Sequence, residues 1–427
     1  MKEQNSLQNN NKAIVLGIHL TSGKNSKEIA EYSLLELAEL AETAGLEVVG
    51  ESLQSRTKID PTYVAGKGKL DEISQMAEAL EAETLVLDLN LSGSQMRNIS
   101  ELTGLKIIDR TLLILDIFAL RATTMEGRLQ VEIAQLNDRA TRLIGAGIAL
   151  SRLGGGIGTR GPGETQLETD RRHIQRRIKT LKHRLKELGK RRQLTRENRE
   201  KNQLITGAIV GYTNAGKSTL MNALCQSDLF TMDQVFATLD PTARRIKNSE
   251  IPILLIDTVG FIRKLPHQLI EAFQSTLEEV SYADFIVQVT DISDPEFEAQ
   301  MDIVERQLEA LNADSKPRIH VFNKIDLAEQ QVIDQLKQTN RHSAKQVFVS
   351  ARNGIGLADL KQVINEIPKY QMLPFHLMIP FDQSQIVSEL RNVAYIDNVE
   401  YTEHGTEISF RIHQGHLGII KPLLQQI

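Results

Sequence analysis

One glycine-rich segment in the middle of the chain constrains the fold more than any other feature. Residues 205–210 are apolar and predict a buried strand, and GYTNAGKS follows directly at 211–218, before an apolar helix pattern. This is the GxxxxGK[ST] motif in its strand–loop–helix setting. Such a loop curls its backbone N–H groups around phosphates, and the helix N-terminus adds positive potential. The expected phosphate contacts are Gly211, Tyr212, Thr213, Asn214, Ala215, Gly216, Lys217 and Ser218.

A second motif distinguishes guanine from adenine. A predicted strand at 318–322 leads into the NKxD pattern of GTP-binding domains, formed by Asn323, Lys324, Ile325 and Asp326. A carboxylate at its last position accepts hydrogen bonds from guanine N1–H and N2–H₂, a donor pair that adenine lacks. The lysine can lie over the base. The strand at 346–349 then precedes a loop resembling the one whose backbone contacts guanine O6, formed by Ser350, Ala351 and Arg352.

Two further segments are expected near the γ-phosphate. The strand at 252–256 ends in a DxxG element formed by Asp257, Thr258, Val259 and Gly260. Its aspartate is expected to orient Mg²⁺ through water, and its glycine N–H to sense the γ-phosphate. The segment that offers a second threonine ligand consists of Phe236, Ala237, Thr238, Leu239 and Asp240. These elements, in this order, predict a GTPase domain with GTP as substrate.

Two cations are considered at this site. The expected protein ligands of Mg²⁺ are Ser218 and Thr238, with Thr242 as the alternative to the threonine. Asn214 has two open interpretations. It holds a potassium ion beside the phosphates, as in several bacterial GTPases, or it is a loop asparagine that satisfies its own backbone.

The residue after the DxxG glycine determines the expected rate of hydrolysis. GTPases that orient the attacking water with a glutamine carry it at this position, whereas this chain has Phe261. A phenylalanine can neither orient water nor bear charge, which leaves Lys217, Thr238 and Gly260 as the catalytic candidates. We therefore expect slow hydrolysis by the isolated protein and stimulation by a partner that orders the site.

Strand and helix patterns predict a multidomain α/β protein. Apolar strands alternate with helices from residue 13, which is typical of a small α/β domain with parallel pairing. Apolar residues spaced by three and four then form two stripes, from Leu129 to Leu143 and from Leu167 to Leu188, which predict an antiparallel helical hairpin. The expected parts are a mobile tail at 1–12, an α/β domain at 13–125, a projecting hairpin at 126–203 with a glycine-rich tip at 154–163, a P-loop GTPase domain with a mostly parallel doubly wound sheet at 204–370, and a small α+β domain at 371–427.

Charge is concentrated on the second arm of this hairpin. The chain has 50 Lys and Arg against 55 Asp and Glu, but residues 152–201 alone carry a net charge of about +10 by the same counting. Such runs are most often solvated helix faces, yet basic residues on a projecting arm also suit phosphate neutralisation. The RNA-contact candidates are Arg160, Arg171, Arg172, Arg176 and Arg177. Gly66-Lys-Gly68 is read equally as a turn and as an RNA contact.

Composition excludes several other classes of protein. A single cysteine, Cys225, excludes a disulfide framework and cysteine-rich zinc sites. The longest apolar run, 111–120, contains Asp116 and is too short to cross a bilayer. We expect a cytoplasmic monomer without an integral membrane span, and peripheral association with a membrane stays open.

Three segments resemble the HflX family of GTPases. They are GGIGTRGPGETQLETDRR at 155–172, DRTLLILDIFALR at 109–121 and YVAGKG at 63–68. The likeness covers roughly residues 13–370 and is looser beyond. It implies a GTPase that binds the large ribosomal subunit and its RNA, and that splits or rescues stalled ribosomes under stress. The alternative is a regulatory GTPase for ribosome assembly or RNA modification, and a role for ATP at the N-terminal domain is open.

Overall fold

The computed structural model describes residues 11–22, 26–153, 162–201, 204–225, 242–246, 253–258, 260–263, 278–338 and 345–413. They fall into two compact units that meet within one long helix, between Leu188 and Gly189.

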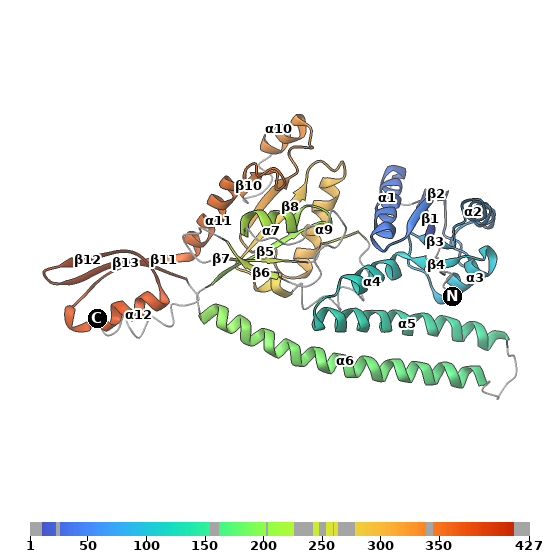
Figure 1. The fold of residues 1–427 in the computed structure, drawn as a ribbon, viewed down its shortest axis with the longest axis horizontal. Helices are drawn as coiled ribbons and strands as arrows, with labels where there is room; N and C mark the ends of the chain where they lie inside the picture. Colours follow the sequence, from blue (N-terminus) through green and yellow to red (C-terminus); the bar gives the residue numbers. More distant parts are fainter. Residues whose placement is uncertain are drawn as a thin grey trace, which may run out of the picture. The chain divides into compact units, whose positions relative to one another are not determined.

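The first unit contains a four-stranded sheet in the order β2-β1-β3-β4 (Figure 1). All of its pairings are parallel, which confirms the predicted α/β domain. Its helices α1 and α4 contact each other, as do α2 and α3. The elements are β1 Lys12–Leu20, α1 Lys27–Thr43, β2 Glu47–Arg56, α2 Lys67–Leu80, β3 Thr84–Leu87, α3 Gly93–Thr103, β4 Lys106–Asp109 and α4 Arg110–Arg121.

Helix α4 explains the longest apolar run of the chain. Asp109 caps the helix by accepting a hydrogen bond from Leu112 N at 2.9 Å. Leu113, Ile114 and Phe118 are all at most 1% exposed. The run is therefore a core helix of the first unit, and none of the helices within the described ranges is long and apolar enough to span a membrane.

Helices α5 Met125–Leu153 and α6 Pro162–Lys201 form the predicted hairpin (Figure 1). Leu129 and Ile133 of α5 are buried together with Leu181 of α6, and the apolar residues packed against them are Leu136, Leu185 and Leu188. The start of α5 thus packs on the later part of α6, as antiparallel arms require. Pro162 begins α6, a position that suits proline because its missing N–H has no partner there. The rest of the predicted tip, 154–161 with Arg160, lies outside the described residues.

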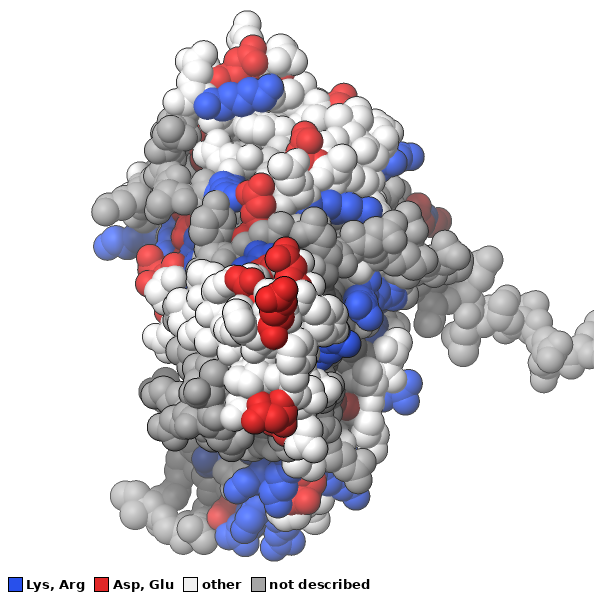
Figure 2. All heavy atoms as spheres, turned by 90° about the vertical axis from the view of Figure 1, so that its left-hand side faces the viewer, with Lys and Arg blue, Asp and Glu red and all other residues white. Residues whose placement is uncertain are grey.

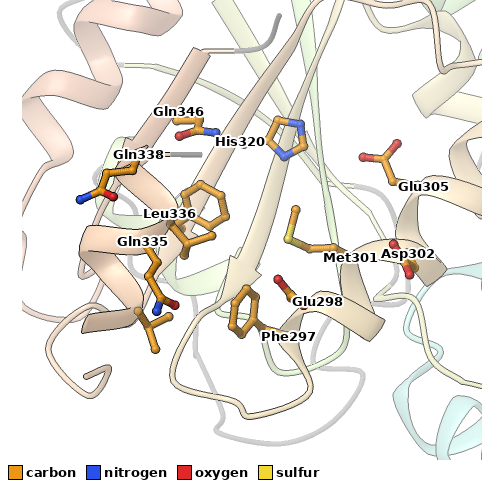
Figure 3. A pocket seen from close by; sticks show the side chains of 12 residues that line it. Phe297, Glu298, Met301, Asp302, Glu305, His320, Gln335, Leu336, Gln338 and Gln346 are labelled. Atoms are coloured by element: carbon orange, nitrogen blue, oxygen red, sulfur yellow. The ribbon is translucent and has the colours of Figure 1, made fainter. Parts of the chain in front are cut away.

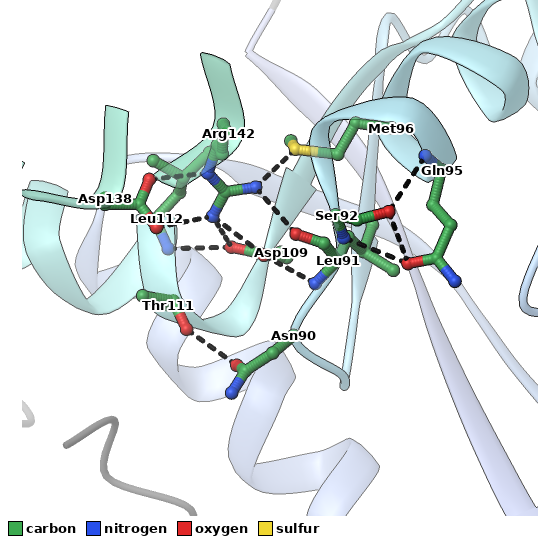
Figure 4. Close-up of polar contacts among 10 residues, drawn as sticks. All are labelled: Asn90, Leu91, Ser92, Gln95, Met96, Asp109, Thr111, Leu112, Asp138 and Arg142. Atoms are coloured by element: carbon green, nitrogen blue, oxygen red, sulfur yellow. Dashed lines mark hydrogen bonds and ion pairs between the residues drawn. The ribbon is translucent and has the colours of Figure 1, made fainter. Parts of the chain in front are cut away.

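A half-buried arginine ties α5 to the sheet of the first unit (Figure 4). Arg142 donates to Asp138 on its own helix at 2.5 Å and to Asp109 at the end of β4 at 2.9 Å. It also donates to Leu91 O at 3.3 Å, and Asp109 is fully buried. One guanidinium therefore joins the hairpin to the carboxyl edge of the sheet.

The second unit contains a six-stranded sheet in the order β10-β9-β8-β5-β7-β6. Every pairing is parallel except that of β6 with β7. This confirms the mostly parallel GTPase sheet, whose two faces are covered by separate apolar clusters. The elements are β5 Ile205–Gly211, α7 Lys217–Cys225, β6 Thr242–Arg245, β7 Ile253–Asp257, β8 Phe285–Asp291, α9 Phe297–Ala310, β9 Arg318–Asn323, α10 Gln330–Gln338, β10 Lys345–Phe348 and α11 Leu357–Gln371.

A small antiparallel sheet follows, in the order β11-β13-β12. Ile386 and Leu390 of the helix α12 are buried with Ile408 and Phe410 of the sheet. The elements are β11 Met372–Ile379, α12 Ser384–Val393, β12 Tyr395–Thr402 and β13 Gly405–His413. Strand β11 includes Pro374, which it tolerates because it lies at the sheet edge. The predicted α+β pattern is confirmed up to β13, and the last predicted helix lies outside the described residues.

Candidate nucleotide site

The phosphate loop connects the carboxyl end of β5 to the first turn of α7. Its two glycines have positive φ, +157° at Gly211 and +89° at Gly216. A Cβ at Gly211 would lie 2.2 Å from Val289 O, and one at Gly216 would lie 2.3 Å from Asn323 Nδ2. Both positions therefore require glycine. Asn214, at φ 61°, is exposed at the tip of the loop.

Lys217 and Ser218 begin α7 beside the end of β7. Lys217 is 7% exposed, and its Nζ donates to Tyr212 O at 2.6 Å. Burial lowers the pKa of Lys217 to about 8, although the nearby Asp257 carboxylate acts to raise it. Ser218 Oγ donates to Asp257 Oδ2 at 2.9 Å, and Asp257 is fully buried. The hydroxyl and carboxylate oxygens predicted around Mg²⁺ are thus brought together, and they are the hard donors that this ion prefers.

The base-recognition motif lies at the carboxyl end of β9. Asn323 Nδ2 donates to Ala215 O at 2.9 Å, and its Oδ1 accepts from Ala351 N at 3.0 Å. The asparagine therefore braces the phosphate loop against the loop at 350–352. Lys324 Nζ pairs with Asp291 Oδ2 at 2.6 Å, while Asp326 is exposed. Of the neighbouring predicted contacts, Ile325 is half-buried, Ser350 and Ala351 are buried and Arg352 is exposed.

The DxxG element contributes side chains with different surroundings. Thr258 is fully buried, and its hydroxyl donates to Ile209 O at 2.7 Å, so this side chain supports the strand beneath the loop. A Cβ at Gly260 would lie 2.9 Å from Lys217 Nζ, which places the glycine against the lysine. Phe261 is 2% exposed and packs in an apolar cluster that includes Val210.

Several predicted residues fall outside the part of the chain that the structure describes. Val259 and the whole segment that offers the second magnesium ligand, Phe236, Ala237, Thr238, Leu239 and Asp240, lie outside the described residues. The alternative ligand, Thr242, is the first residue of β6 and is half-buried.

Some contacts at the site were not predicted. The Lys324–Asp291 pair and an ion pair between Arg263 and Glu296, at 2.9 Å, are both additions. Asp291 ends an apolar strand, and polar residues at the carboxyl ends of parallel strands gather at one edge, so that signal was available. No local pattern indicated the partner of Arg263.

A separate cavity of about 690 Å³ lies between α9 and α10 (Figure 3). None of the predicted nucleotide contacts lines it, so it is a different feature from the phosphate loop. The lining residues are Phe297, Glu298, Met301, Asp302, Glu305, His320, Phe322, Val332, Gln335, Leu336, Gln338 and Gln346.

The basic candidates on α6 are exposed, but they are not equivalent. Arg177 pairs with Glu132 of α5 at 2.8 Å, and Arg172 pairs with Glu168 on its own helix at 2.7 Å. Lys and Arg side chains gather at the lower end of Figure 2, where Figure 1 draws α6. Arg171 and Arg176 are also exposed. Arg177 thus links the two arms, while its neighbours face outward.

Three family models match successive parts of the chain between residues 31 and 324. A family model described as "GTP-binding GTPase N-terminal" matches residues 31–119, "GTP-binding GTPase Middle Region" matches 121–199 and "50S ribosome-binding GTPase" matches 206–324. A crystal structure of a GTP-binding protein from Sulfolobus solfataricus in complex with GDP is 24% identical, covers 84% of this chain and 99% of its own, and has a TM-score of 0.45.

Two curated relatives are similar over nearly the whole length. GTPase HflX of Caldanaerobacter subterraneus subsp. tengcongensis is 46% identical over 383 residues, which is 90% of this chain and 88% of the relative. GTPase HflX of Escherichia coli is 38% identical over 401 residues, 94% of this chain and 92% of the relative. With this identity and coverage, the chain belongs to the HflX family of GTPases, which hydrolyse GTP.

Proposed function

We propose that this GTPase binds the large ribosomal subunit in its GTP state and splits or rescues stalled ribosomes. The observation that carries the proposal is the combination of a GTPase sheet with a long helix whose outer face is basic. Support for the partner comes from the family model of residues 206–324, whose description names the 50S ribosome.

In the proposed complex, the phosphate loop holds the triphosphate through its backbone and Lys217 neutralises the β- and γ-phosphates. Mg²⁺ binds Ser218 and Thr238, and Asp257 orients the ion through water. Asp326 accepts from both guanine donors while Lys324 covers the base. The remaining backbone contacts are those predicted along 211–218, 236–240, 257–260 and 350–352.

Slow hydrolysis in isolation follows from the position of Phe261. Its side chain is in the core and its backbone is paired with the phosphate loop, so this position supplies no group that orients water. A partner that completes the active site of a GTPase can raise the rate of GTP hydrolysis by a factor of ~10³–10⁵. GTP then favours the ribosome-bound state and hydrolysis releases the factor.

The outer face of α6 supports an RNA partner. Buried Ile174 and Leu181 mark the side of α6 that faces α5. The opposite side carries exposed basic residues spaced by three and four, namely Arg172, Arg176, Lys179, His183 and Lys186. A continuous basic stripe of this kind suits a row of phosphates, with counterions released on binding.

The test measures single-turnover GTP hydrolysis with and without large ribosomal subunits. We expect a slow basal rate that the subunits raise by a factor of ~10³ or more. Replacing Arg171, Arg172, Arg176 and Arg177 by alanine should remove this stimulation at moderate salt, while the basal rate and GTP affinity stay unchanged. A fast basal rate that the subunits do not change would refute the proposal.

The salt dependence of subunit binding separates RNA contact from a solvated helix. Each lost phosphate contact should lower the slope of log K against log salt by ~0.7–0.9. Arg177 should contribute least because Glu132 already pairs with it. Alanine at Arg306 and Arg391, two exposed arginines elsewhere, is the matched control.

An assembly or RNA-modification factor is the alternative reading. It predicts preference for immature subunits and no release of small subunits from intact ribosomes, which density-gradient sedimentation with a non-hydrolysable GTP analogue resolves. Potassium beside Asn214 stays a prediction, and equal turnover in potassium and sodium buffers would contradict it.

A further inference from the structure

Three hydrogen bonds hold the segment after the DxxG element against the phosphate loop. Phe261 N donates to Gly211 O at 3.0 Å, and Thr213 N donates to Phe261 O at 2.8 Å. Arg263 N donates to the phenol oxygen of Tyr212 at 2.8 Å. The first two bonds form an isolated parallel bridge between backbones, whereas the third is accepted by the side chain of Tyr212 and is lost when the phenol hydroxyl is removed.

Tyr212 is at the centre of these contacts. It is 4% exposed, so its hydroxyl is held within the protein. Its carbonyl oxygen accepts from Lys217 Nζ at 2.6 Å, on the side where the loop is expected to bind phosphates. Its side chain reaches Arg263 on the other side, and Arg263 continues the tie to Glu296 at the start of α9, at 2.9 Å. Tyr212 thus contacts both Lys217 and the segment that follows the DxxG element.

This position gives Tyr212 influence over Gly260. The glycine is next to the bridged Phe261, and a Cβ added to it would lie 2.9 Å from both Lys217 Nζ and Thr213 Cγ2. If the phenol releases Arg263, the residues after Phe261 lose a side-chain hydrogen bond to the phosphate loop. The Gly260 N–H then becomes less well oriented, and a donor that must be ordered at the moment of binding contributes less.

We propose that Tyr212 is a positioning residue for recognition of the γ-phosphate. Its phenol pre-orders residues 260–263 so that the Gly260 N–H meets the γ-phosphate, a group that GDP lacks. The proposal rests on the proposed nucleotide roles of Lys217 and Gly260. The GxxxxGK[ST] motif accepts any residue at position 212, so the proposal gives this side chain a function that the motif does not specify.

Tyr212→Phe removes the hydroxyl and keeps the buried ring. We expect the affinity for a non-hydrolysable GTP analogue to fall by about fivefold, the range of one net hydrogen bond, while GDP affinity changes by less than about twofold. Tyr401→Phe, at a side chain that is 73% exposed in the C-terminal sheet, is the matched control and should change neither affinity.

Glu296→Gln gives a second measurement that leaves the phosphate loop untouched. It weakens the outer pair with Arg263 and should lower the ratio of GTP to GDP affinity in the same direction, by a smaller factor. If Tyr212→Phe weakens both nucleotides equally, or lowers only the melting temperature, the tyrosine is merely a core residue and the proposal is wrong. Absence of nucleotide binding by the unaltered chain would instead refute the proposed site, and ribosomes are not needed in either measurement.

Discussion

The two parallel sheets of this protein share an architecture but differ at their carboxyl edges. In the first unit, Arg110 is 1% exposed and pairs with Glu36 and, at 2.7 Å, with Asp88, which directly follows β3. Asp88 also accepts from Ser33 at 2.7 Å. Oppositely charged side chains therefore occupy this edge and form ion pairs with one another. Ligands of parallel α/β sheets bind at that edge, so its side chains decide whether a site exists.

The edge of the GTPase sheet is arranged differently, although it also contains the Lys324–Asp291 pair. The segment after β5 turns through Gly216 and exposes Asn214 at its tip, and Asp326 after β9 is exposed to solvent. Its buried cation, Lys217, has a backbone carbonyl as its hydrogen-bond acceptor. The contrast lies in the buried cation: carboxylates neutralise Arg110 in the first sheet, whereas Lys217 of the GTPase sheet lies beside backbone donors of a glycine-containing loop, an arrangement that suits an anion.

The pKa values express the same difference. Burial by itself lowers the pKa of the Arg110 guanidinium, but the carboxylates of Glu36 and Asp88 raise it above its ordinary value. Burial lowers the pKa of Lys217 to about 8, and Asp257 only partly opposes this. Two carboxylates neutralise Arg110 within the fold, whereas the charged form of Lys217 is fully favoured only when phosphates bind.

The largest expected effect comes from Asp326→Asn, which alters the carboxyl edge of the GTPase sheet. An amide cannot accept from both guanine donors, so preference for GTP over ATP should fall by a factor of ~10⁴. Competition binding with the two nucleotides measures this, with Asp382→Asn in the C-terminal domain as the control. Retention of tight, selective GTP binding would show that the base lies elsewhere.

Arg110→Met tests the ion pairs at the carboxyl edge of the first sheet. It leaves the Glu36 and Asp88 carboxylates buried without their cation, which should destabilise the first unit by ~3–5 kcal/mol. Urea unfolding followed by hydrogen exchange in β3 and β4 measures the change. The exposed Arg97–Glu101 pair at 3.7 Å provides a control, because Arg97→Met should change stability by less than ~1 kcal/mol. GTP affinity should stay constant, and a parallel loss of GTP binding would contradict the assigned division of roles.

The smallest effect concerns pH. Because Lys217 has a pKa of about 8 and bound phosphates favour its charged form, binding should take up a proton. GTP affinity should then fall about fourfold between pH 7 and 8.5, and Lys217→Met should bind more weakly with a flatter profile. In the nucleotide-free chain, the same lowered pKa disfavours folding below pH 8, and this penalty disappears as the pH rises toward 10.5. A flat affinity profile in the unaltered chain would show that Lys217 stays charged.

Most of the architecture could be predicted because it depends on local patterns. The phosphate loop, the NKxD motif and the two helical stripes are each defined within a short stretch, where periodicity and glycine geometry constrain the backbone. The placement of Phe261 in the core agrees with its apolar side chain. Strand β2 pairs with β1 as far as Arg56, and no local signal reports that partner.

The sequence alone determined the order of the motifs, the parallel α/β class, the hairpin and the family. Only the tertiary structure decided which charged and polar side chains meet: Arg110 with Glu36, Arg142 with Asp109, Tyr212 with Arg263. Local sterics and side-chain periodicity act between neighbours in the chain and can be read from them. These partners are separated by 74, 33 and 51 residues, and their pairing depends on how the strands and helices between them pack.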